Sequence, residues 1–456
     1  MTQKIVWGIM LMACVAGCGK KDFLDAKPNS NLFIPSTLDD FQEILDRDAM
    51  NETPELGEIS SDNYYLLSYL FWQSIPAKER NAYVWASDTY QGQGAVLDWN
   101  TPYQQVFAAN VVLEGIDKVT VTPANQQQWS AIKGAAYFVR AYAFYNLSQV
   151  FAPVYDETTA ATDLGIPLRL TTDINAPSTR ASVKDTYDQI FSDLAQAYPL
   201  LPAMIPQNNR NRASQPAVLA LKARIYLGMR QYNKAGLCAD SCLMMYNALM
   251  DYNSLPAPPP FLRTNPEAIY QSRMQPTTSV LKSSASNCII DSNLYKSFDN
   301  NDWRKQLFFT INGSSGLPIL KYTYTYSTYC FTGLATDEVY LIRAECYARS
   351  GNTAAAMADL NTLLQSRWKN TVTYTQLTAS TPAAALALVL AERRKELCFR
   401  GLRWTDLRRL NKDGYNITLT RVLNGQTYQL APGDLRYVFP IPPDVITLGG
   451  IQQNPR

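Results

Sequence analysis

The chain has 456 residues, with 41 Lys and Arg against 39 Asp and Glu, and it contains no histidine. A formal net charge of +2 excludes the strongly basic surface on which nucleic-acid binding depends, so nucleic acid is not an expected partner. The lack of histidine excludes Ser-His-Asp and Cys-His nucleophilic sites and zinc sites that use histidine. The sequence also has no glycine-rich phosphate loop or nucleophile elbow, and we expect no cofactor and no metal.

The N-terminus is typical of an exported bacterial lipoprotein. An apolar run at residues 5–15 leads into Ala16-Gly17 and then Cys18, and small residues before a cysteine resemble the lipobox. We predict a lipoprotein signal peptide at residues 1–17 and lipidation at Cys18 rather than Cys14, because only Cys18 follows Ala-Gly. Ordinary cleavage with release of the protein is the alternative. No later apolar run approaches the roughly 20 residues that a membrane-spanning helix needs.

The next segment is predicted to be polar and extended, with one short helix at residues 37–45 that is capped by Ser36 or Thr37. Residues 58–99 are rich in aromatic residues but show no helical periodicity, so we predict a recognition loop there. The aromatic residues of this loop are Tyr64, Tyr65, Tyr69, Trp72, Tyr83, Trp85, Tyr90 and Trp99.

Long helices are predicted at residues 103–119 and 125–150. A pattern of a basic residue, an alanine and an aromatic residue three positions later occurs three times, and two of its copies continue into a second helix after a short turn. A small and a large residue on one helix face favour close packing of helix pairs, as in tetratricopeptide-like repeats. The three copies are Arg140-Ala141-x-x-Phe144, Lys222-Ala223-x-x-Tyr226 and Arg343-Ala344-x-x-Tyr347.

Irregular segments at residues 153–180 and 253–332 interrupt the helices. In the second segment Tyr322, Tyr324 and Tyr326 alternate with threonines, which predicts a strand with one aromatic face. Residues 415–430 are predicted as a small hairpin that turns at Asn424-Gly425.

An arginine-rich stretch lies at residues 391–410. Leucines at helical spacing upstream of it predict a buried helix face, and Arg393 falls on that face. Because a buried guanidinium must be paired, we expect carboxylate or carbonyl partners for Arg393 inside the protein. Gly401 is expected to end this helix, and Trp404 to lie on the apolar face of a second one.

Several motifs carry a resemblance to the SusD/RagB family, which comprises nutrient-binding lipoproteins of the Bacteroidetes outer membrane. Two positions depart from the family pattern: Arg400 stands where the family commonly has Glu, and Gly449-Gly450 where it often has Asn-Pro. The matching motifs are ERRKEL followed by Phe399, Gly401, Arg403, Trp404 and DLRR, the tail FPIPPDVITLGGIQQNPR, the opening FLDAKPNSN, and Asn301-Asp302-Trp303-Arg304.

The resemblance implies a mostly α, SusD-like scaffold with tetratricopeptide-like helix pairs, long loop insertions and a few short hairpins. After the signal peptide, residues 18–456 are expected to form one globular unit, with an N-terminal SusD-like part at 22–210 and a C-terminal SusD/RagB part at 250–456. The resemblance further implies binding of oligosaccharides or polysaccharides at the cell exterior and their delivery to a SusC-like, TonB-dependent outer-membrane barrel. A peptide is the alternative cargo.

Loop aromatics are the main candidates for ligand binding, because flat aromatic faces stack on sugar rings while neighbouring polar groups bind the hydroxyls. Trp404 and the helix residues Tyr226, Tyr340 and Tyr347 are assigned to the core instead. The candidates are Tyr64, Tyr65, Trp72, Trp85, Tyr90, Trp303 and Tyr324.

A glycoside hydrolase is the less favoured alternative, since it needs only two carboxylates. The pairs Glu55 with Glu58 and Asp299 with Asp302 are available, but nothing in the sequence separates them from other charges, and we predict no enzymatic activity. The cysteines beyond Cys18 are expected to be buried thiols, although their spacing leaves disulfides open.

Overall fold

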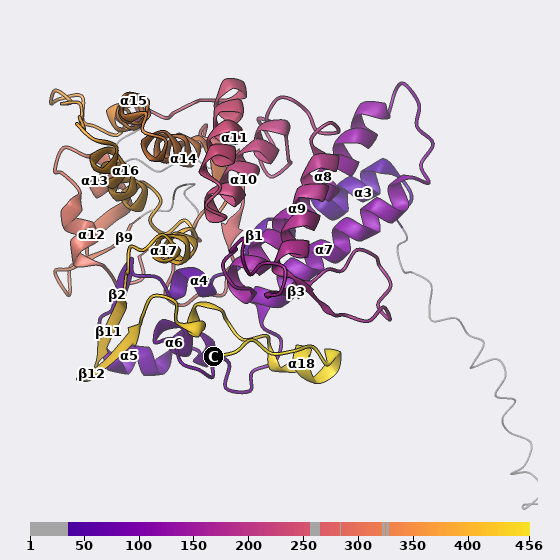
Figure 1. The fold of residues 1–456 in the computed structure, drawn as a ribbon, viewed down its shortest axis with the longest axis horizontal. Helices are drawn as coiled ribbons and strands as arrows, with labels where there is room; N and C mark the ends of the chain where they lie inside the picture. Colours follow the sequence, from indigo (N-terminus) through magenta and orange to yellow (C-terminus); the bar gives the residue numbers. More distant parts are fainter. Residues whose placement is uncertain (1–34, 256–264, 283, 322–323, 325–327) are drawn as a thin grey trace, which may run out of the picture.

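The computed structural model describes residues 35–255, 265–282, 284–321, 324 and 328–456 (Figure 1). The predicted lipidation site Cys18 and most of the predicted strand of alternating tyrosines lie outside these residues. The described chain is a helical scaffold edged by small sheets, which confirms the predicted fold class.

The N-terminal half is built on four helices. The first is capped as predicted, because the Thr37 hydroxyl accepts a hydrogen bond from the Asp40 amide at 3.2 Å while the Asp40 carboxylate accepts one from the Thr37 amide at 2.8 Å. The four are α3 (Leu38–Leu45), α7 (Leu97–Ile116), α8 (Gln126–Phe151) and α9 (Val183–Ala197).

Helix pairs continue the scaffold across the molecule, from α8 and α9 through α10 and α11 to α14, α15 and α16 (Figure 1). Ala141, Ala223 and Ala344 of the repeated pattern are fully buried where neighbouring helices meet, which confirms their predicted packing role. The later helices are α10 (Gln215–Gly228), α11 (Tyr232–Met245), α14 (Thr336–Arg349), α15 (Thr353–Gln365), α16 (Pro382–Glu396) and α17 (Arg403–Lys412).

In the part of the chain that the structure describes, the strands are short and form five small sheets. The largest has the order β2-β7-β9-β8, with β2 (Tyr64–Leu66), β7 (Cys288–Ile290), β9 (Pro318–Leu320) and β8 (Phe309–Ile311). The predicted hairpin is confirmed: β11 (Leu419–Leu423) pairs with β12 (Gln426–Leu430), and both turn residues have positive φ. The other pairs are β1 (Glu52–Thr53) with β6 (Arg273–Met274), β3 (Leu164–Pro167) with β4 (Arg180–Ser182), and β5 (Ala268–Tyr270) with β10 (Leu334–Ala335).

The prediction that residues 58–99 form a loop without helices is wrong in part. Short helices begin after a polar or proline residue at the N-cap position. Ser68 is an example, because its hydroxyl accepts a hydrogen bond from the Phe71 amide at 3.1 Å. The short helices of the molecule are α4 (Leu56–Ile59), α5 (Tyr69–Ser74), α6 (Ala77–Tyr83), α12 (Ser292–Ser297), α13 (Trp303–Phe308) and α18 (Pro443–Gly449), with 3-10 turns at Asp48–Asn51, Tyr252–Ser254 and Leu435–Tyr437.

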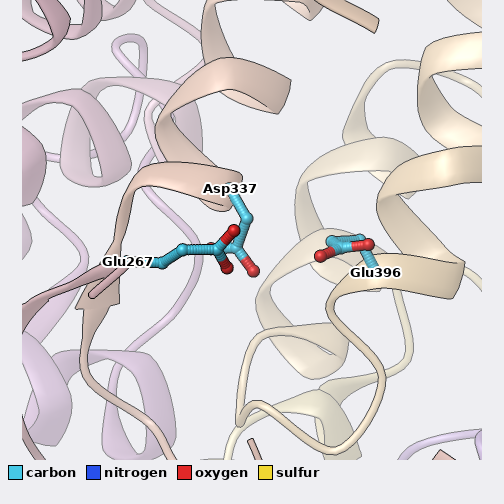
Figure 2. Close-up of side chains that lie close together, drawn as sticks. All are labelled: Glu267, Asp337 and Glu396. Atoms are coloured by element: carbon cyan, nitrogen blue, oxygen red, sulfur yellow. The ribbon is translucent and has the colours of Figure 1, made fainter. Parts of the chain in front are cut away.

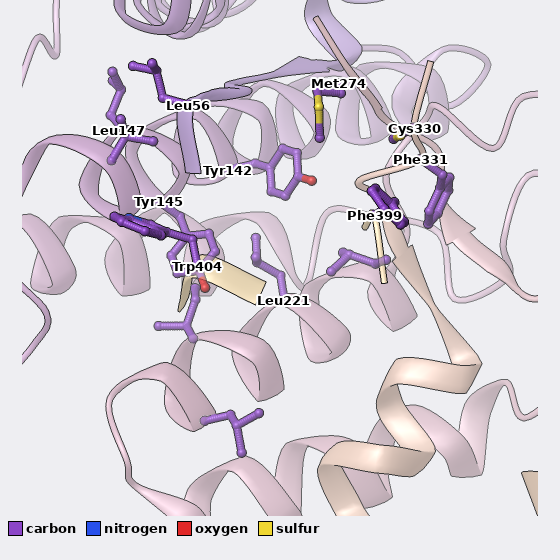
Figure 3. Packing of buried hydrophobic residues seen from close by; sticks show 14 of the residues in the cluster. Leu56, Tyr142, Tyr145, Leu147, Leu221, Met274, Cys330, Phe331, Phe399 and Trp404 are labelled. Atoms are coloured by element: carbon purple, nitrogen blue, oxygen red, sulfur yellow. The ribbon is translucent and has the colours of Figure 1, made fainter. Parts of the chain in front are cut away.

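One apolar core joins distant parts of the chain. Leu56 and Leu147 from the N-terminal half pack in the same cluster as Leu221, Phe399 and Trp404 (Figure 3). The ring centroid of Trp404 lies 4.8 Å from that of Tyr437, so the arginine-rich motif and the tail close this core together.

The arginines of residues 391–410 are largely paired inside the protein. Arg393 is buried, and its Nε lies 2.9 Å from a carboxylate oxygen of Asp406, which confirms the predicted burial and pairing. Arg409 contacts Asp406 and Glu345, each at 2.7 Å. Arg400, which stands where the family commonly has Glu, lies 2.9 Å from Asp337. This stretch is therefore a structural element.

A group of three buried carboxylates, Glu267, Asp337 and Glu396, lies beside these pairs (Figure 2). Arg367 lies 2.9 Å from Glu267 and 2.7 Å from Glu396, and Arg304 lies 2.9 Å from Glu396. Burial raises the pKa of Glu267 to about 7, whereas for Glu396 the two guanidiniums outweigh burial and lower the pKa to about 2. The guanidiniums of Arg304 and Arg367 supply the positive charge that buried carboxylates need as partners.

Arg304 also connects the Asp-x-Arg motif to the scaffold. Its guanidinium lies 2.6 Å from Asp302, two positions earlier, and 2.9 Å from Glu392 of α16. This motif therefore fixes the start of α13 against α16 and leaves Trp303 between two anchored residues.

Candidate functional site

Four of the predicted ligand-binding aromatics lie in the core. Tyr64, Trp85, Tyr90 and Tyr324 are 1%, 1%, 2% and 5% exposed, so almost none of their ring surface reaches solvent. Their polar atoms are also bonded within the protein: the Tyr64 hydroxyl donates to a backbone carbonyl at 2.8 Å, the Trp85 indole donates to one at 3.1 Å, and the Tyr324 hydroxyl contacts Glu267. These four residues shape the scaffold under the surface and present almost no ring face to a ligand.

The other three predicted residues, Tyr65, Trp72 and Trp303, are half-buried, but the structure does not bring them all together. The Trp303 indole donates to the Asn253 side chain at 2.6 Å, and the Lys369 ammonium lies 5.3 Å from its ring centroid. Trp303 therefore belongs to the surface around Asn253 and Lys369, whereas Tyr65 and Trp72 lie on β2 and α5.

An aromatic pair lies on the surface of α5. The rings of Tyr69 and Trp72 stack with centroids 5.4 Å apart and an interplanar angle of 25°. No residue of α5 is buried, and Leu70 on the same helix is 76% exposed. We call Tyr65, Tyr69, Trp72, Gln73 and Arg80 the α5 patch. Figure 1 shows α5 at the edge of the molecule, beside α6 and the β11–β12 hairpin.

Polar groups border the aromatic pair. The Trp72 indole donates to the Arg80 carbonyl at 2.9 Å, and the Arg80 guanidinium lies 5.9 Å from the Trp72 ring centroid. Gln73 donates to the Tyr69 hydroxyl at 3.1 Å, and Arg80 donates to the side chain of Gln91 at 3.0 Å. These contacts hold an amide and a guanidinium next to flat apolar rings. Such a surface can stack on an apolar ligand face and hydrogen-bond its edges.

Strand alternation sets the role of each tyrosine on β2. Tyr64 points into the core while Tyr65, the next residue, is half-buried and pairs with Ile289 of β7. The ligand-binding candidates predicted from the sequence do not include Tyr69, Gln73 and Arg80, although Tyr69 lies in the predicted recognition loop. The three-residue spacing of Tyr69 and Trp72 was the available signal, since residues three apart on a helix are neighbours.

The carboxylates considered for glycoside hydrolysis are bonded within the protein. Lys78 lies 2.5 Å from Glu55, and Glu58 accepts hydrogen bonds from Asn63 at 2.8 Å and from the Gly401 amide at 3.1 Å. Burial raises the pKa of Glu55 and of Glu58 to about 7. Of the second pair, Asp302 is the partner of Arg304 described above. Asp299 accepts a hydrogen bond from the Asn301 amide at 2.7 Å, so each of these carboxylates is bonded within the protein.

Among the described residues, no helix combines the length and the apolar character that crossing a bilayer requires. The cysteines of the described chain are free thiols: Cys238 is half-buried, and the others, Cys242, Cys288, Cys330, Cys346 and Cys398, are buried.

Comparison with known proteins identifies the scaffold. Residues 22–227 match a family model described as "Starch-binding associating with outer membrane", and residues 320–456 match the model of the SusD family. A SusD-like protein of Formosa agariphila is 24% identical over 191 residues, which cover 41% of this chain and 33% of the relative. The match thus spans about a third of that relative's length.

Solved structures show the same fold. A putative sugar-binding protein of Bacteroides vulgatus superposes with a TM-score of 0.74 at 20% identity, covering 93% of this chain and 99% of its own. A SusD superfamily protein of Bacteroides thetaiotaomicron gives a TM-score of 0.70 at 21% identity, covering 92% and 100%. A laminarin-binding SusD-like protein gives 0.62 at 16% identity, covering 92% and 97%. Since residues 22–227 match one model of SusD-like proteins and residues 320–456 match the other, the chain belongs to the SusD/RagB family.

Proposed function

We propose that this protein is a cell-surface glycan-binding lipoprotein that captures oligosaccharides on the α5 patch. The observation that carries the proposal is the stacked pair of Tyr69 and Trp72 on a helix with no buried residue, bordered by Gln73 and Arg80. Support for a carbohydrate as ligand comes from the family description and from the relatives named as sugar-binding and laminarin-binding.

In this proposal the protein does no chemistry on its ligand. It is anchored in the outer membrane through lipid on Cys18, faces the cell exterior, and delivers bound oligomers to a SusC-like, TonB-dependent barrel. The carboxylate pairs that a hydrolase would use are bonded within the protein, which favours binding over hydrolysis. Trp303 is kept as a separate candidate contact on another part of the surface.

The test is calorimetric titration of the mature protein with laminarihexaose, maltohexaose and cellohexaose, and with short peptides as the competing class of cargo. We expect at least one hexasaccharide to bind. Trp72→Ala should then weaken binding about tenfold, because it removes a stacking face worth roughly 1 to 1.5 kcal/mol.

A matched control is Trp129→Ala. Trp129 is also half-buried, its indole also donates to a backbone carbonyl, at 3.0 Å, and a cation, Lys133, lies 4.7 Å from its ring centroid. Trp129 belongs to α8 and not to the α5 patch, so its loss should leave glycan affinity unchanged. Equal weakening by both variants would remove the α5 patch as the site. If the protein binds peptides but none of the glycans, its cargo is a peptide.

A further inference from the structure

A groove of about 520 Å³ lies between α18 and the segment that joins β3 to β4. Figure 1 shows α18 at the edge of the molecule, next to the β3 region. This volume lies within the range of small-ligand sites in proteins. We call it the α18 groove, and the lining residues that matter here are Trp99, Tyr103, Arg169, Ile174, Asp444 and Leu448.

Two aromatic residues of α7 line the groove and are fixed in place. The ring centroids of Trp99 and Tyr103 are 4.8 Å apart, and the edge of Phe151 packs against Trp99 with centroids 5.0 Å apart. The Tyr103 hydroxyl donates to the Pro167 carbonyl at 2.8 Å. These rings are therefore held by the core before any ligand arrives, which lowers the entropy cost of binding.

The rim of the groove is apolar and open to solvent. Ile174, on the segment after β3, is 80% exposed, and Leu448, on α18, is 88% exposed. Arg169 holds its segment in shape, because the guanidinium donates to the Ser178 hydroxyl at 2.8 Å and to the carbonyls of Ala176 and Asp173. The exposed apolar rim and the segment held by Arg169 together offer contact area for a flat apolar ligand face.

One acceptor in the groove has no partner among the described residues. Asp444 accepts the Ala95 amide through Oδ2 at 3.1 Å, while its Oδ1 is buried and makes no hydrogen bond. A buried acceptor without a donor is costly, so Asp444 favours a ligand whose O–H or N–H group its carboxylate can turn to meet. Arg169 and Asp444 carry opposite charges, so the groove has no excess charge with which to select an ionic ligand.

We propose that the α18 groove is a second saccharide-binding site, which takes the end of a neutral oligosaccharide. A neutral sugar presents apolar C–H faces for the aromatic and aliphatic lining, and hydroxyl donors for Asp444 Oδ1. The α18 groove and the α5 patch have no residue in common. The inference rests on the proposed function for the class of ligand, and its location is independent of that proposal.

The experiment isolates the groove by using mature protein that carries both Tyr69→Ala and Trp72→Ala, which together remove the two stacked rings of the α5 patch. Laminarihexaose, maltohexaose and cellohexaose are titrated into it by calorimetry. We expect residual binding of at least one of them. Adding Asp444→Asn should weaken that binding roughly tenfold or more, because the change keeps the shape and the Ala95 contact but replaces the free acceptor with a donor.

Two controls match the change in chemistry. Asp188→Asn alters an exposed carboxylate of α9 that pairs with Lys184, and it should leave the residual binding unchanged. Leu448→Ser should weaken the binding, whereas Met244→Ser, at a residue of α11 that is 80% exposed, should not. Asp188, Leu448 and Met244 are exposed and Asp444 is half-buried, so the variants are expected to fold.

The outcomes separate the two proposals. If Tyr69→Ala and Trp72→Ala together remove all glycan binding, the groove inference is overturned while the α5 patch stands. If residual binding is insensitive to both Asp444→Asn and Leu448→Ser, the groove is likewise excluded. If the wild-type protein binds none of the tested glycans, both proposals are overturned. A change from dimer to monomer on Leu448→Ser, with saccharide binding unaltered, would assign the groove to a second copy of the chain.

Discussion

Glu58 is one of the residues whose role depends on burial. Its carboxyl group lies at the junction of α4 with the turn before α17, where it accepts hydrogen bonds from Ser61 at 3.2 Å, Asn63 at 2.8 Å and the Gly401 amide at 3.1 Å. Burial is the largest influence and raises its pKa to about 7, although these donors lower it. Folding therefore stabilises the protonated form relative to the unfolded chain.

This residue gives a prediction about pH. Between the ordinary value of 4.5 and about 7 the folded state binds more protons than the unfolded state, so stability falls as pH rises through that window. The contribution of Glu58 is fully present below pH 4.5 and lost above pH 7, and is at most roughly 3 kcal/mol. We expect Glu58→Gln to flatten the fall of the melting temperature between pH 5 and pH 8.

Glu43→Gln is the control, because Glu43 is exposed on α3 and should leave the pH profile unchanged. Glu55 and Glu267 also have pKa values raised to about 7 by burial, so part of the slope should persist in Glu58→Gln. A slope identical to that of the wild type would contradict the assignment to Glu58.

Arg400 shows how a departure from a family pattern is accommodated. It lies 2.9 Å from Asp337, and its guanidinium carbon is 4.0 Å from the ring centroid of Tyr324 and 4.6 Å from that of Phe331. Arg400 therefore forms an ion pair with a carboxylate of α14. A carboxylate at position 400 would face Asp337 directly, so arginine suits this chain better than the common glutamate.

At the scale of elements, the β11–β12 hairpin is tied to the elements that carry the α5 patch. Arg421 is buried and donates to the carbonyls of Tyr64, Tyr83 and Ser61, and its guanidinium lies 4.1 Å from the ring centroid of Tyr83. Its neighbour Val422 is 67% exposed on the opposite face of the strand. The hairpin thus braces β2 and α6, which flank α5.

We predict that Arg421→Met loosens these elements. The change leaves several buried carbonyls without donors and should lower the free energy of unfolding by roughly 2 to 4 kcal/mol. Hydrogen exchange should quicken in β2 and α6, and glycan affinity at the α5 patch should fall although Arg421 touches no ligand. Val422→Ser is the control on the same strand and should change neither exchange nor affinity. Unchanged exchange in β2 and α6 would show that the hairpin does not brace them.

At the scale of the whole molecule, the C-terminal tail is hydrogen-bonded to the N-terminal half of the chain. The Asn454 side chain donates to the Phe151 carbonyl at 2.9 Å and to the Phe439 carbonyl at 2.8 Å, and the Tyr90 hydroxyl donates to the Pro440 carbonyl at 2.8 Å. The tail thus closes onto the N-terminal half. The division into parts at 22–210 and 250–456 that share one scaffold stays a prediction.

In our proposal, a single residue, Cys18, attaches the whole protein to the membrane. We expect Cys18→Ala to move the protein from the membrane fraction to the soluble fraction of the cell, because lipid on this cysteine would be its anchor. Fractionation followed by immunoblotting measures this, with Cys14→Ala as the control that should remain in the membrane. Retention of the Cys18→Ala protein in membranes would contradict the anchor.

The sequence alone determined the features that depend on local pattern. Helical spacing and capping residues predicted α3, α8 and the paired helices, Asn424-Gly425 predicted the hairpin turn, and the apolar face of α16 predicted the pairing of Arg393. These signals are strong because each depends on residues within a few positions of one another.

Tertiary structure decided which aromatics face solvent. Tyr64 and Tyr65 are adjacent in sequence, and packing of β2 against β7 and the core, rather than residue type, buries one ring and leaves the other accessible. The α18 groove likewise joins residues about 350 positions apart, since Asp444 accepts the Ala95 amide. Local sequence encodes the elements of this protein, whereas burial and the accessible surface arise only when distant segments pack, because solvent exposure is a property of the whole fold.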